Sequence, residues 1–182
     1  MKQNMDSPAL AENFLPEYLR NGKKIIIITG EVNSGKTARV EKVVALLNRL
    51  QGRTAGVYSK GVFRKEKKVG YTIVSVESGQ SSGFATDTQT DKYTLRQGRY
   101  WFDESVFEVY NQKLIEKQNS DYILIDEIGP LELKDKGFHI ALKHLLQHHQ
   151  KKLVLIIRSR LIEKVLNKYG LKKEDVEISY VT

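Results

Sequence analysis

Residues 24–37 read KIIIITGEVNSGKT, and this stretch decides the fold. Its continuous apolar run is typical of a β-strand that is covered on both faces. The run is followed at once by Gly30-Glu31-Val32-Asn33-Ser34-Gly35-Lys36-Thr37, which satisfies the pattern G-x-x-x-x-G-K-[ST]. After Thr37 the apolar spacing becomes that of an amphipathic helix. A strand, a glycine-containing turn and a helix N-terminus in this order predict a phosphate-binding loop.

Each residue type in this loop has its own expected role. Gly30 and Gly35 let the backbone approach phosphate oxygens, and Asn33 tolerates positive φ better than most residues. Lys36 is expected to reach the β- and γ-phosphates, and the Thr37 hydroxyl to bind Mg²⁺. Because consecutive backbone N–H groups face the phosphate, the predicted nucleotide-binding set also includes Glu31, Val32, Ser34 and Ala38.

A second motif is the run Tyr122-Ile123-Leu124-Ile125-Asp126-Glu127, an apolar strand that ends in two carboxylates. Alone, such a strand end indicates only a surface pair or a cap. Combined with a phosphate loop that ends 89 residues earlier, it predicts that Asp126 binds the metal and that Glu127 orients or deprotonates the attacking water.

Strands and helices alternate along the rest of the chain. Strands are expected at 54–58, 122–125, 153–157 and 176–181, and helices at about 37–50, 103–118, 138–149 and 161–169. The alternation predicts an α/β fold with a mainly parallel sheet that helices cover on both faces. Ligands of such sheets bind beyond the carboxyl ends of the strands.

The segment that follows the second predicted strand has a different pattern. Residues 61–76 contain two β-prone pieces around a charged stretch, which predicts a small β-hairpin insertion. Residues 77–92 are polar and rich in turn formers, and we expect a loop there.

Length and composition favour a single globular domain. The chain has 182 residues, of which 40% are hydrophobic and 29% charged, and it contains no cysteine. The absence of cysteine excludes disulfides, thiolate metal sites and cysteine nucleophiles, and it fits a reducing cytoplasm. No apolar stretch is long enough to span a bilayer, so we expect no membrane partner. We expect an N-terminal extension at 1–22 and a nucleotide-binding domain at 23–182.

The positive charge of the chain is unevenly distributed. The formal net charge is +8, and residues 134–173 hold eleven Lys or Arg against two acidic residues, a net charge of +9. Such a segment can attract phosphate-bearing partners. The favoured alternative is that these side chains solvate the outer faces of helices.

The run Asp126-Glu127-Ile128-Gly129-Pro130-Leu131-Glu132-Leu133, followed by Phe138, resembles the signature of a family of small P-loop nucleoside-triphosphatases of the cancer-related type. The resemblance covers about residues 24–170. It implies a RecA-like α/β fold and slow, Mg²⁺-dependent hydrolysis of several nucleoside triphosphates to diphosphates and phosphate. It also implies that Glu127 is the catalytic carboxylate. Asp135 stands where the family usually has Ser, and Ala38 where it often has a second Thr.

Several other residues have two possible roles each. Arg158 follows an apolar strand and can neutralise charge on the transferred phosphoryl group or bind a surface carboxylate; Arg160 is a weaker candidate. Glu132 is either a further acid or, as we favour, the anchor of a turn. His144 and His148 have chelating spacing but lack the Glu of H-E-x-x-H, which favours a polar helix flank over zinc. The run at 100–102, YWF, is expected to be core, with base stacking as the alternative.

These observations favour an Mg²⁺-dependent nucleoside-triphosphatase that transfers the γ-phosphoryl group to water, with loose base selectivity. The first alternative is a kinase of a nucleotide or small metabolite, because the same residues can pass phosphate to another acceptor. No arginine-rich acceptor lid is evident between the two motifs. The second, weaker alternative is a nucleic-acid-binding ATPase, suggested by the basic segment at 134–173.

Overall fold

The computed structural model describes residues 16–30, 36–50 and 54–180, and in these residues nine strands form one sheet with the order β5-β6-β4-β3-β2-β7-β8-β1-β9. The strands are β1 (Ile25–Gly30), β2 (Thr54–Arg64), β3 (Lys67–Ser75), β4 (Ser81–Thr86), β5 (Leu95–Gln97), β6 (Tyr100–Phe102), β7 (Tyr122–Ile128), β8 (Lys152–Arg158) and β9 (Val176–Tyr180). The α-helices are α2 (Glu17–Arg20), α3 (Lys36–Leu47), α4 (Glu104–Glu116), α5 (His139–His148) and α6 (Ile162–Tyr169). Short 3₁₀ turns are η1 (Asn48–Leu50), η2 (Glu132–Lys134), η3 (Ser159–Leu161) and η4 (Lys173–Asp175).

The first strand lies inside the sheet, as its apolar sequence predicts. All six residues of β1 are buried, and β1 pairs in parallel with β8 on one side and β9 on the other. Its side chains alternate between the two faces: Ile26 and Ile28 enter one apolar cluster, while Ile25 and Ile27 enter the other. Each fully buried Ile contributes about 1.5–3 kcal/mol of transfer free energy.

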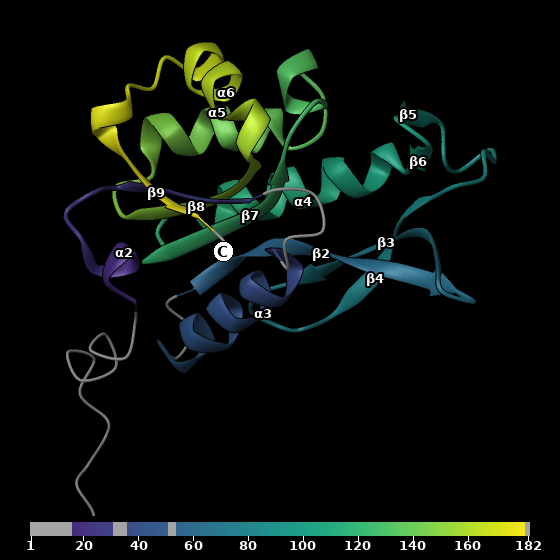
Figure 1. Cartoon of the computed structure of the whole chain (residues 1–182), viewed down its shortest axis with the longest axis horizontal. Helices are drawn as coiled ribbons and strands as arrows, with labels where there is room; N and C mark the ends of the chain where they lie inside the picture. The colour runs from purple at the N-terminus through teal and green to yellow at the C-terminus, as the bar shows by residue number, and fades with distance from the viewer. Residues whose placement is uncertain (1–15, 31–35, 51–53, 181–182) are drawn as a thin grey trace, which may run out of the picture.

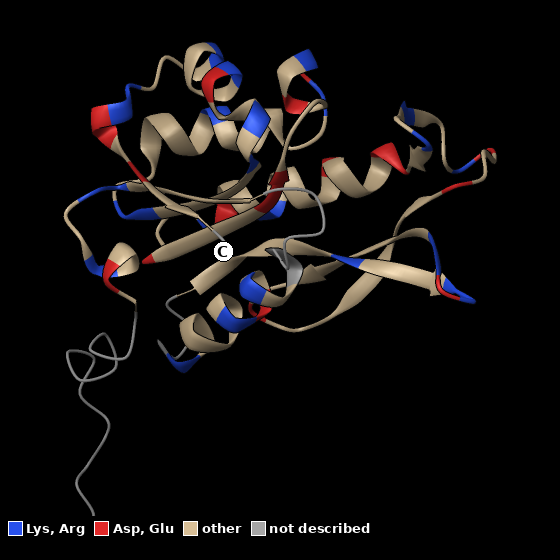
Figure 2. Ribbon diagram, in the orientation of Figure 1, with Lys and Arg blue, Asp and Glu red and all other residues tan. Residues whose placement is uncertain are grey.

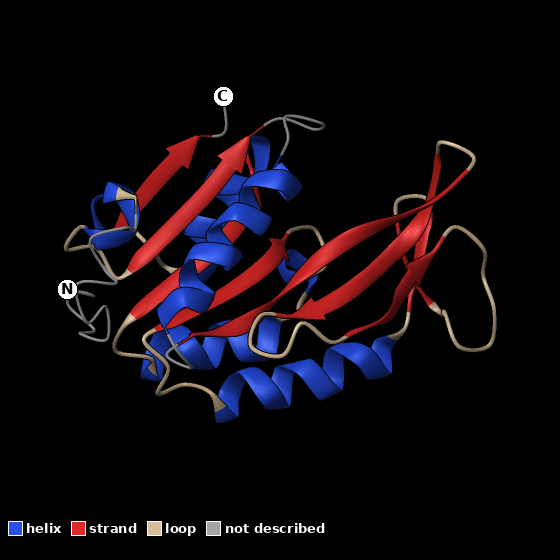
Figure 3. Ribbon diagram, turned by 90° about the horizontal axis from the view of Figure 1, so that it is seen from below, coloured by secondary structure: helices blue, strands red, loops and turns tan. Residues whose placement is uncertain are grey.

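Helices cover both faces of the parallel strands, as predicted. Figure 1 shows α3 on one side of the sheet and α4, α5 and α6 on the other, and Figure 3 shows the same layers from below. The predicted apolar face of α3 is buried against the sheet through Val40, Val43, Val44 and Leu47. On the other face, Phe107 of α4, Leu142 of α5 and Val165 of α6 share a cluster with Ile25 and Ile27.

The antiparallel part of the sheet is larger than the sequence suggested. The predicted hairpin is present, because β2 pairs with β3 in antiparallel register from Val57↔Ser75 to Arg64↔Lys67. The predicted loop at 77–92 is wrong in part, since residues 81–86 form β4. The short strands β5 and β6 extend the same sheet. We refer to β3, β4, β5, β6 and the outer part of β2 as the antiparallel extension.

The remaining predicted elements agree with the structure within a few residues. Asp103 caps α4 as expected, with its side chain accepting from the Ser105 N–H at 3.1 Å. Of the aromatic run, Phe102 packs against the core with Phe84 and Phe107, whereas Tyr100 and Trp101 stay partly exposed.

The predicted division of the chain at residue 22 stays a prediction. Among the described residues before it, Leu19 of α2 is fully buried in the cluster that contains Ile26 and Ile28. Within the described ranges, no helix is both long and apolar enough to cross a membrane.

Candidate functional site

The carboxyl ends of β1, β7 and β8 bring the predicted site residues to one edge of the sheet. Gly30, the first residue of the phosphate-loop motif, ends β1 and is the register partner of Arg158, which ends β8. On the other side of β8, Asp126 of β7 is the register partner of Ile156. The register then shifts before Ile128, so one extra β7 residue lies at this edge. The two motifs therefore converge through β8, which lies between their strands.

Glu127 and Arg158 form an ion pair across this edge. Arg158 Nε lies 2.5 Å from Glu127 Oε1, and Arg158 Nη2 donates to Glu127 Oε2 at 3.2 Å. One contact is a charge-assisted hydrogen bond and the other a close contact of opposite charges. Burial alone would lower the pKa of the Arg158 guanidinium, but the charge and hydrogen bond of Glu127 outweigh burial and raise it above its ordinary value. Arg160 is exposed in η3, so Arg158 is the arginine that meets the acid pair.

Asp126 is held by a residue that the sequence analysis missed. Ser59 of β2 donates its backbone N–H to Asp126 Oδ2 at 3.0 Å and its hydroxyl to the Asp126 carbonyl at 3.2 Å. The backbone pairing of β2 with β7 ends at Val57. Two residues further along β2, the Asp126 side chain binds the Ser59 N–H and continues the link between the two strands. Asp126 is 9% exposed and keeps its carboxylate at the edge. A single serine inside a strand carries no motif, and only the pairing of β2 with β7 reveals it.

Tyr71 of β3 is a second residue that the sequence did not single out as a site residue. Burial raises the pKa of Tyr71 to about 12; Tyr100 and Glu127 act in the same direction, and Arg158 opposes them. The Tyr71 hydroxyl is therefore close enough to the Glu127–Arg158 pair to sense both charges. The structure thus brings the antiparallel extension to the edge that carries Glu127 and Arg158.

Glu132 has the structural role that we favoured. It is 2% exposed, its Oε2 accepts from the Gly129 N–H at 2.7 Å, and its Oε1 accepts from the Phe138 N–H at 2.8 Å. Burial raises the pKa of the Glu132 carboxyl to about 7, against the opposing effect of these two backbone donors. Glu132 thus closes the turn that follows β7, where Gly137 (φ +65°) passes next to its carboxylate.

Most of the phosphate loop lies outside the described residues. This applies to Glu31, Val32, Asn33, Ser34 and Gly35. Of Lys36 and Thr37 only the place in the first turn of α3 is described, and Ala38 follows them as an exposed residue of that helix. Gly30 at the end of β1 and α3 after the loop supply the strand and helix that the motif requires. The roles of these nine residues stay predictions.

Six of the eleven cations in the basic segment at 134–173 form ion pairs with carboxylates. Lys168 pairs with Asp135 at 2.7 Å, Lys173 with Glu163 at 2.6 Å, and Lys151 with Asp121. Figure 2 shows acidic residues interspersed among these cations. This favours helix solvation over a nucleic-acid site in this segment.

The histidines of α5 are used in hydrogen bonds. His144 Nε2 lies 2.9 Å from Gln118 Oε1, and His148 Nδ1 lies 2.9 Å from the His144 carbonyl. In the described part of the chain, no three His, Asp or Glu side chains gather to hold a metal ion.

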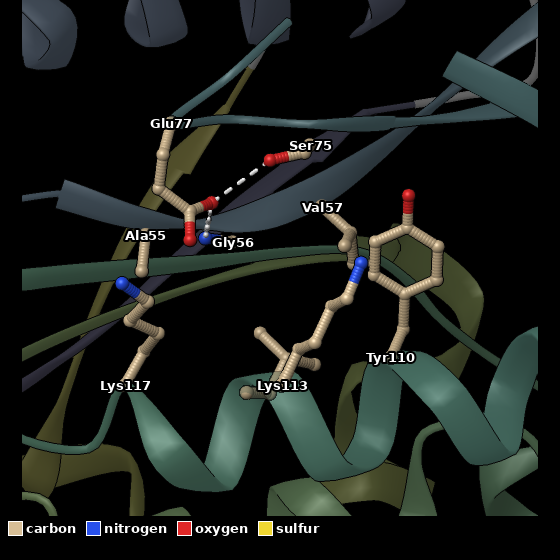
Figure 4. Close-up of a pocket in the computed structure, with 9 residues that line it drawn as sticks. Ala55, Gly56, Val57, Ser75, Glu77, Tyr110, Lys113 and Lys117 are labelled. Atoms are coloured by element: carbon tan, nitrogen blue, oxygen red, sulfur yellow. Dashed lines mark hydrogen bonds between the residues drawn. The ribbon is translucent and has the colours of Figure 1, made fainter. Parts of the chain in front are cut away.

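A small pocket lies between α4 and the strands β2 and β3 (Figure 4). It is lined by Ala55, Gly56, Val57, Ser75, Glu77, Tyr110, Lys113, Leu114 and Lys117. The lining residues Ala55 and Val57 pair with Ile123 and Ile125 of β7, so this part of the pocket lies before Asp126 along the strand. Glu77 accepts from the Gly56 N–H at 3.3 Å and the Ser75 hydroxyl at 3.1 Å, and thereby links β2 to the end of β3. Its polar group is occupied in holding the sheet.

A mainly parallel set of central strands, with a phosphate-loop motif that starts at the end of β1 and an acid pair at the carboxyl end of β7, defines the class of P-loop nucleoside-triphosphatases. Comparison with known families agrees: the model of a family described as NTPase matches residues 25–182. The chain belongs to this NTPase family.

Curated relatives and solved structures support the assignment. Nucleoside-triphosphatase THEP1 of Thermotoga maritima is 26% identical over 147 residues, 79% of this chain and 80% of the relative. THEP1 of Aquifex aeolicus is 31% identical over 144 residues, 74% and 78% of the two chains. The crystal structure of Aquifex aeolicus THEP1 matches 87% of this chain and 90% of that chain, with a TM-score of 0.62 and 26% identity. The solution structure of a human cancer-related nucleoside triphosphatase matches 87% and 89%, with a TM-score of 0.65 and 22% identity, a likeness of fold. The resemblance and the α/β fold inferred from the sequence are confirmed.

Proposed function

We propose that this chain is an Mg²⁺-dependent nucleoside-triphosphatase that hydrolyses several nucleoside triphosphates to diphosphates and phosphate, slowly and with loose base selectivity. The observation that carries the proposal is the convergence of Gly30, Asp126, Glu127 and Arg158 at one sheet edge. Loose base selectivity follows because every assigned contact concerns phosphate, metal or water. A cytoplasmic location, suggested by the absence of cysteine, belongs to the same proposal.

The residues at this edge suit magnesium. Mg²⁺ prefers oxygen ligands and keeps several waters, so one or two protein oxygens suffice. Asp126 offers a carboxylate whose Oδ2 is fixed by the Ser59 N–H, and Thr37 offers a hydroxyl in the first turn of α3 by the motif. When bound, the metal would neutralise charge on the β- and γ-phosphate oxygens.

The remaining residues divide the chemistry between them. Lys36 and the loop backbone would hold the β- and γ-phosphates. Glu127 would accept a proton from the attacking water, whose oxygen bonds to the γ-phosphorus while the bond to the bridging β–γ oxygen breaks. Arg158 would move from Glu127 to the γ-phosphoryl oxygens and neutralise the charge that develops there.

Slow turnover has a physical basis in the Glu127–Arg158 ion pair. Both carboxylate oxygens of Glu127 contact Arg158, at 2.5 and 3.2 Å. At least one of them must leave the arginine to accept a proton from water. This exchange of partners adds a step before chemistry.

The test is phosphate release from ATP, GTP, CTP and UTP with Mg²⁺ and no added acceptor. Glu127→Gln and Lys36→Ala should each lose most turnover, by about 100-fold or more. Glu163→Gln is the matched control, because the same change is made on α6 at a carboxylate that pairs with Lys173. Wild-type turnover in Glu127→Gln would contradict the assigned base. Nucleotide consumption that requires an added acceptor would indicate a kinase and not a hydrolase.

A further inference from the structure

One face of the antiparallel extension carries interleaved aromatic rings and cations. Lys68 of β3 has its Nζ 5.4 Å from the Phe63 ring centroid and 5.1 Å from that of Tyr71. Tyr71 meets Tyr100 of β6 edge to face at 5.0 Å, and the Arg99 guanidinium lies 4.8 Å from the Tyr100 ring. Phe63, Lys68, Tyr71, Arg99 and Tyr100 thus form a continuous surface, which we call the aromatic–basic strip.

The strip is fixed in place and open to solvent at its outer end. Arg99 Nη2 donates to the Lys68 carbonyl at 2.8 Å and to the Tyr100 hydroxyl at 2.5 Å, which joins β3 to β6. Phe63 is 61% exposed, although it is a large apolar side chain, and Arg99 is also exposed. Lys68, Tyr71 and Tyr100 are half-buried. Exposed aromatic surface held among cations is a feature of binding faces.

Several cations of this region have no ion-pair partner among the described carboxylates, although Lys67 of β3 pairs with Asp87 at 3.8 Å. In the residues that the structure describes, none of Arg64, Lys65, Lys68 and Arg99 forms an ion pair with a carboxylate. This differs from the segment 134–173, where Lys and Arg pair repeatedly with Asp and Glu. Figure 2 shows the basic residues at the hairpin end and near β5 and β6, at the end of the molecule remote from β9.

The strip begins next to Glu127 and Arg158 and extends away from the phosphate-loop motif. Its inner residue, Tyr71, senses the charges of Arg158 and Glu127. The phosphate-loop motif follows β1, which β8 and β7 separate from β2 and the extension. The rings of the strip are therefore on the acid-pair side, away from the loop that would hold the triphosphate.

We propose that the aromatic–basic strip binds single-stranded nucleic acid. Cations without acidic partners attract the phosphate backbone, and exposed rings stack on unpaired bases, whatever the base. A duplex would present its phosphates but not its base faces, so it would use only half of this chemistry. The proposal does not depend on hydrolysis.

The experiment is fluorescence anisotropy of labelled 12-nucleotide oligo(U) and oligo(dT) with the full chain, without nucleoside triphosphate. Four cations, Arg64, Lys65, Lys68 and Arg99, predict a log–log salt slope of about −3, so affinity should fall about 50-fold between 50 and 200 mM salt. Phe63→Ala should weaken binding by about 5- to 150-fold through lost stacking. Its control is Ile140→Ala on α5, an apolar side chain with nearly the same exposure (63%), which should bind as wild type does.

A second pair of variants tests which face of the antiparallel extension binds the nucleic acid. Arg96 pairs with Trp101, and Trp101 points to the opposite side from Tyr100 because strand side chains alternate. Arg99→Ala should weaken binding and reduce the salt slope by about 0.7, whereas Arg96→Ala should change either quantity less. Any of three results overturns the proposal. The first is an affinity that does not fall between 50 and 200 mM salt, or no binding at 50 mM. The second is an equal effect of the two arginine variants, and the third is a duplex that binds as tightly as the single strand.

Discussion

Gly137 and Gly170 form a matched pair for testing the turn that Glu132 closes. Both have left-handed backbones, with φ of +65° and +64°. A Cβ added at Gly137 would lie 2.1 Å from Glu132 Oε1, whereas a Cβ added at Gly170 meets nothing within 4 Å. The two alanine variants therefore share the backbone cost and differ in the contact with Glu132.

The magnitude follows from these contacts. Each Gly→Ala change at left-handed φ costs about 1–2 kcal/mol. Gly137→Ala also displaces Glu132 Oε1 from the Phe138 N–H, which it accepts at 2.8 Å, and an unsatisfied buried donor costs about 1–3 kcal/mol. We expect losses in unfolding free energy of about 2–5 kcal/mol for Gly137→Ala and about 1–2 kcal/mol for Gly170→Ala.

Urea denaturation of the two variants measures the difference directly. The reasoning is refuted if the two variants lose the same stability. A second comparison uses the Glu132→Ala background, where the carboxylate is gone. There the extra loss caused by Gly137→Ala should disappear, because interacting substitutions are not additive.

Three further predictions concern the acid, the serine and the hairpin turn. Burial raises the pKa of Glu132 from its ordinary 4.5 to about 7, so the fold binds this proton more tightly than the unfolded chain does. The contribution of Glu132 to the unfolding free energy should therefore fall by up to about 3 kcal/mol as the pH rises from 4.5 through 7. In urea denaturation, the unfolding free energy of wild type relative to that of Glu132→Gln should be lower at pH 8 than at pH 5. Ser59→Ala removes the hydroxyl bond to Asp126, and a Mg²⁺ titration of phosphate release should show about a tenfold higher requirement; an unchanged requirement would contradict the role of Ser59. Glu66 has φ +61° in the two-residue turn between β2 and β3, so Glu66→Gly should raise the unfolding free energy by about 1 kcal/mol in the same urea assay.

The parallel half of the fold could be predicted because its sequence signals are local. The apolar run of β1 and the α3 face of Val40, Val43 and Leu47 mark buried elements without knowledge of their partners. The outer strands have no such signal. β4 reads SSGFAT, in which only Phe84 and Ala85 are buried, and its strand state comes from pairing with β3 and β6. Tertiary pairing overrides a polar, turn-prone sequence there.

Some residues of the candidate site are likewise marked by local sequence, whereas others depend on tertiary pairing. Glu127 and Asp126 could be predicted because a motif names them, and Arg158 because it ends a strand at the same edge. Ser59 and the placement of Tyr71 depend on which strands are neighbours, and sheet order is not written in any single segment. The sequence left two interpretations of Arg158, a role at the phosphoryl group or an ion pair with a surface carboxylate, and in the structure its partner is Glu127, the predicted base.

β2 is a single continuous strand of both halves of the sheet, pairing with β7 up to Val57 and with β3 as far as Arg64. Backbone in this conformation can hardly be stretched, so the six residues from Ser59 to Arg64 act as a stiff rod of about 20 Å. A lengthwise displacement of the hairpin must then move Ser59, and with it the hydrogen bonds that hold Asp126. A partner that binds the outer end of β2 therefore pulls on Asp126, near the carboxyl end of β7.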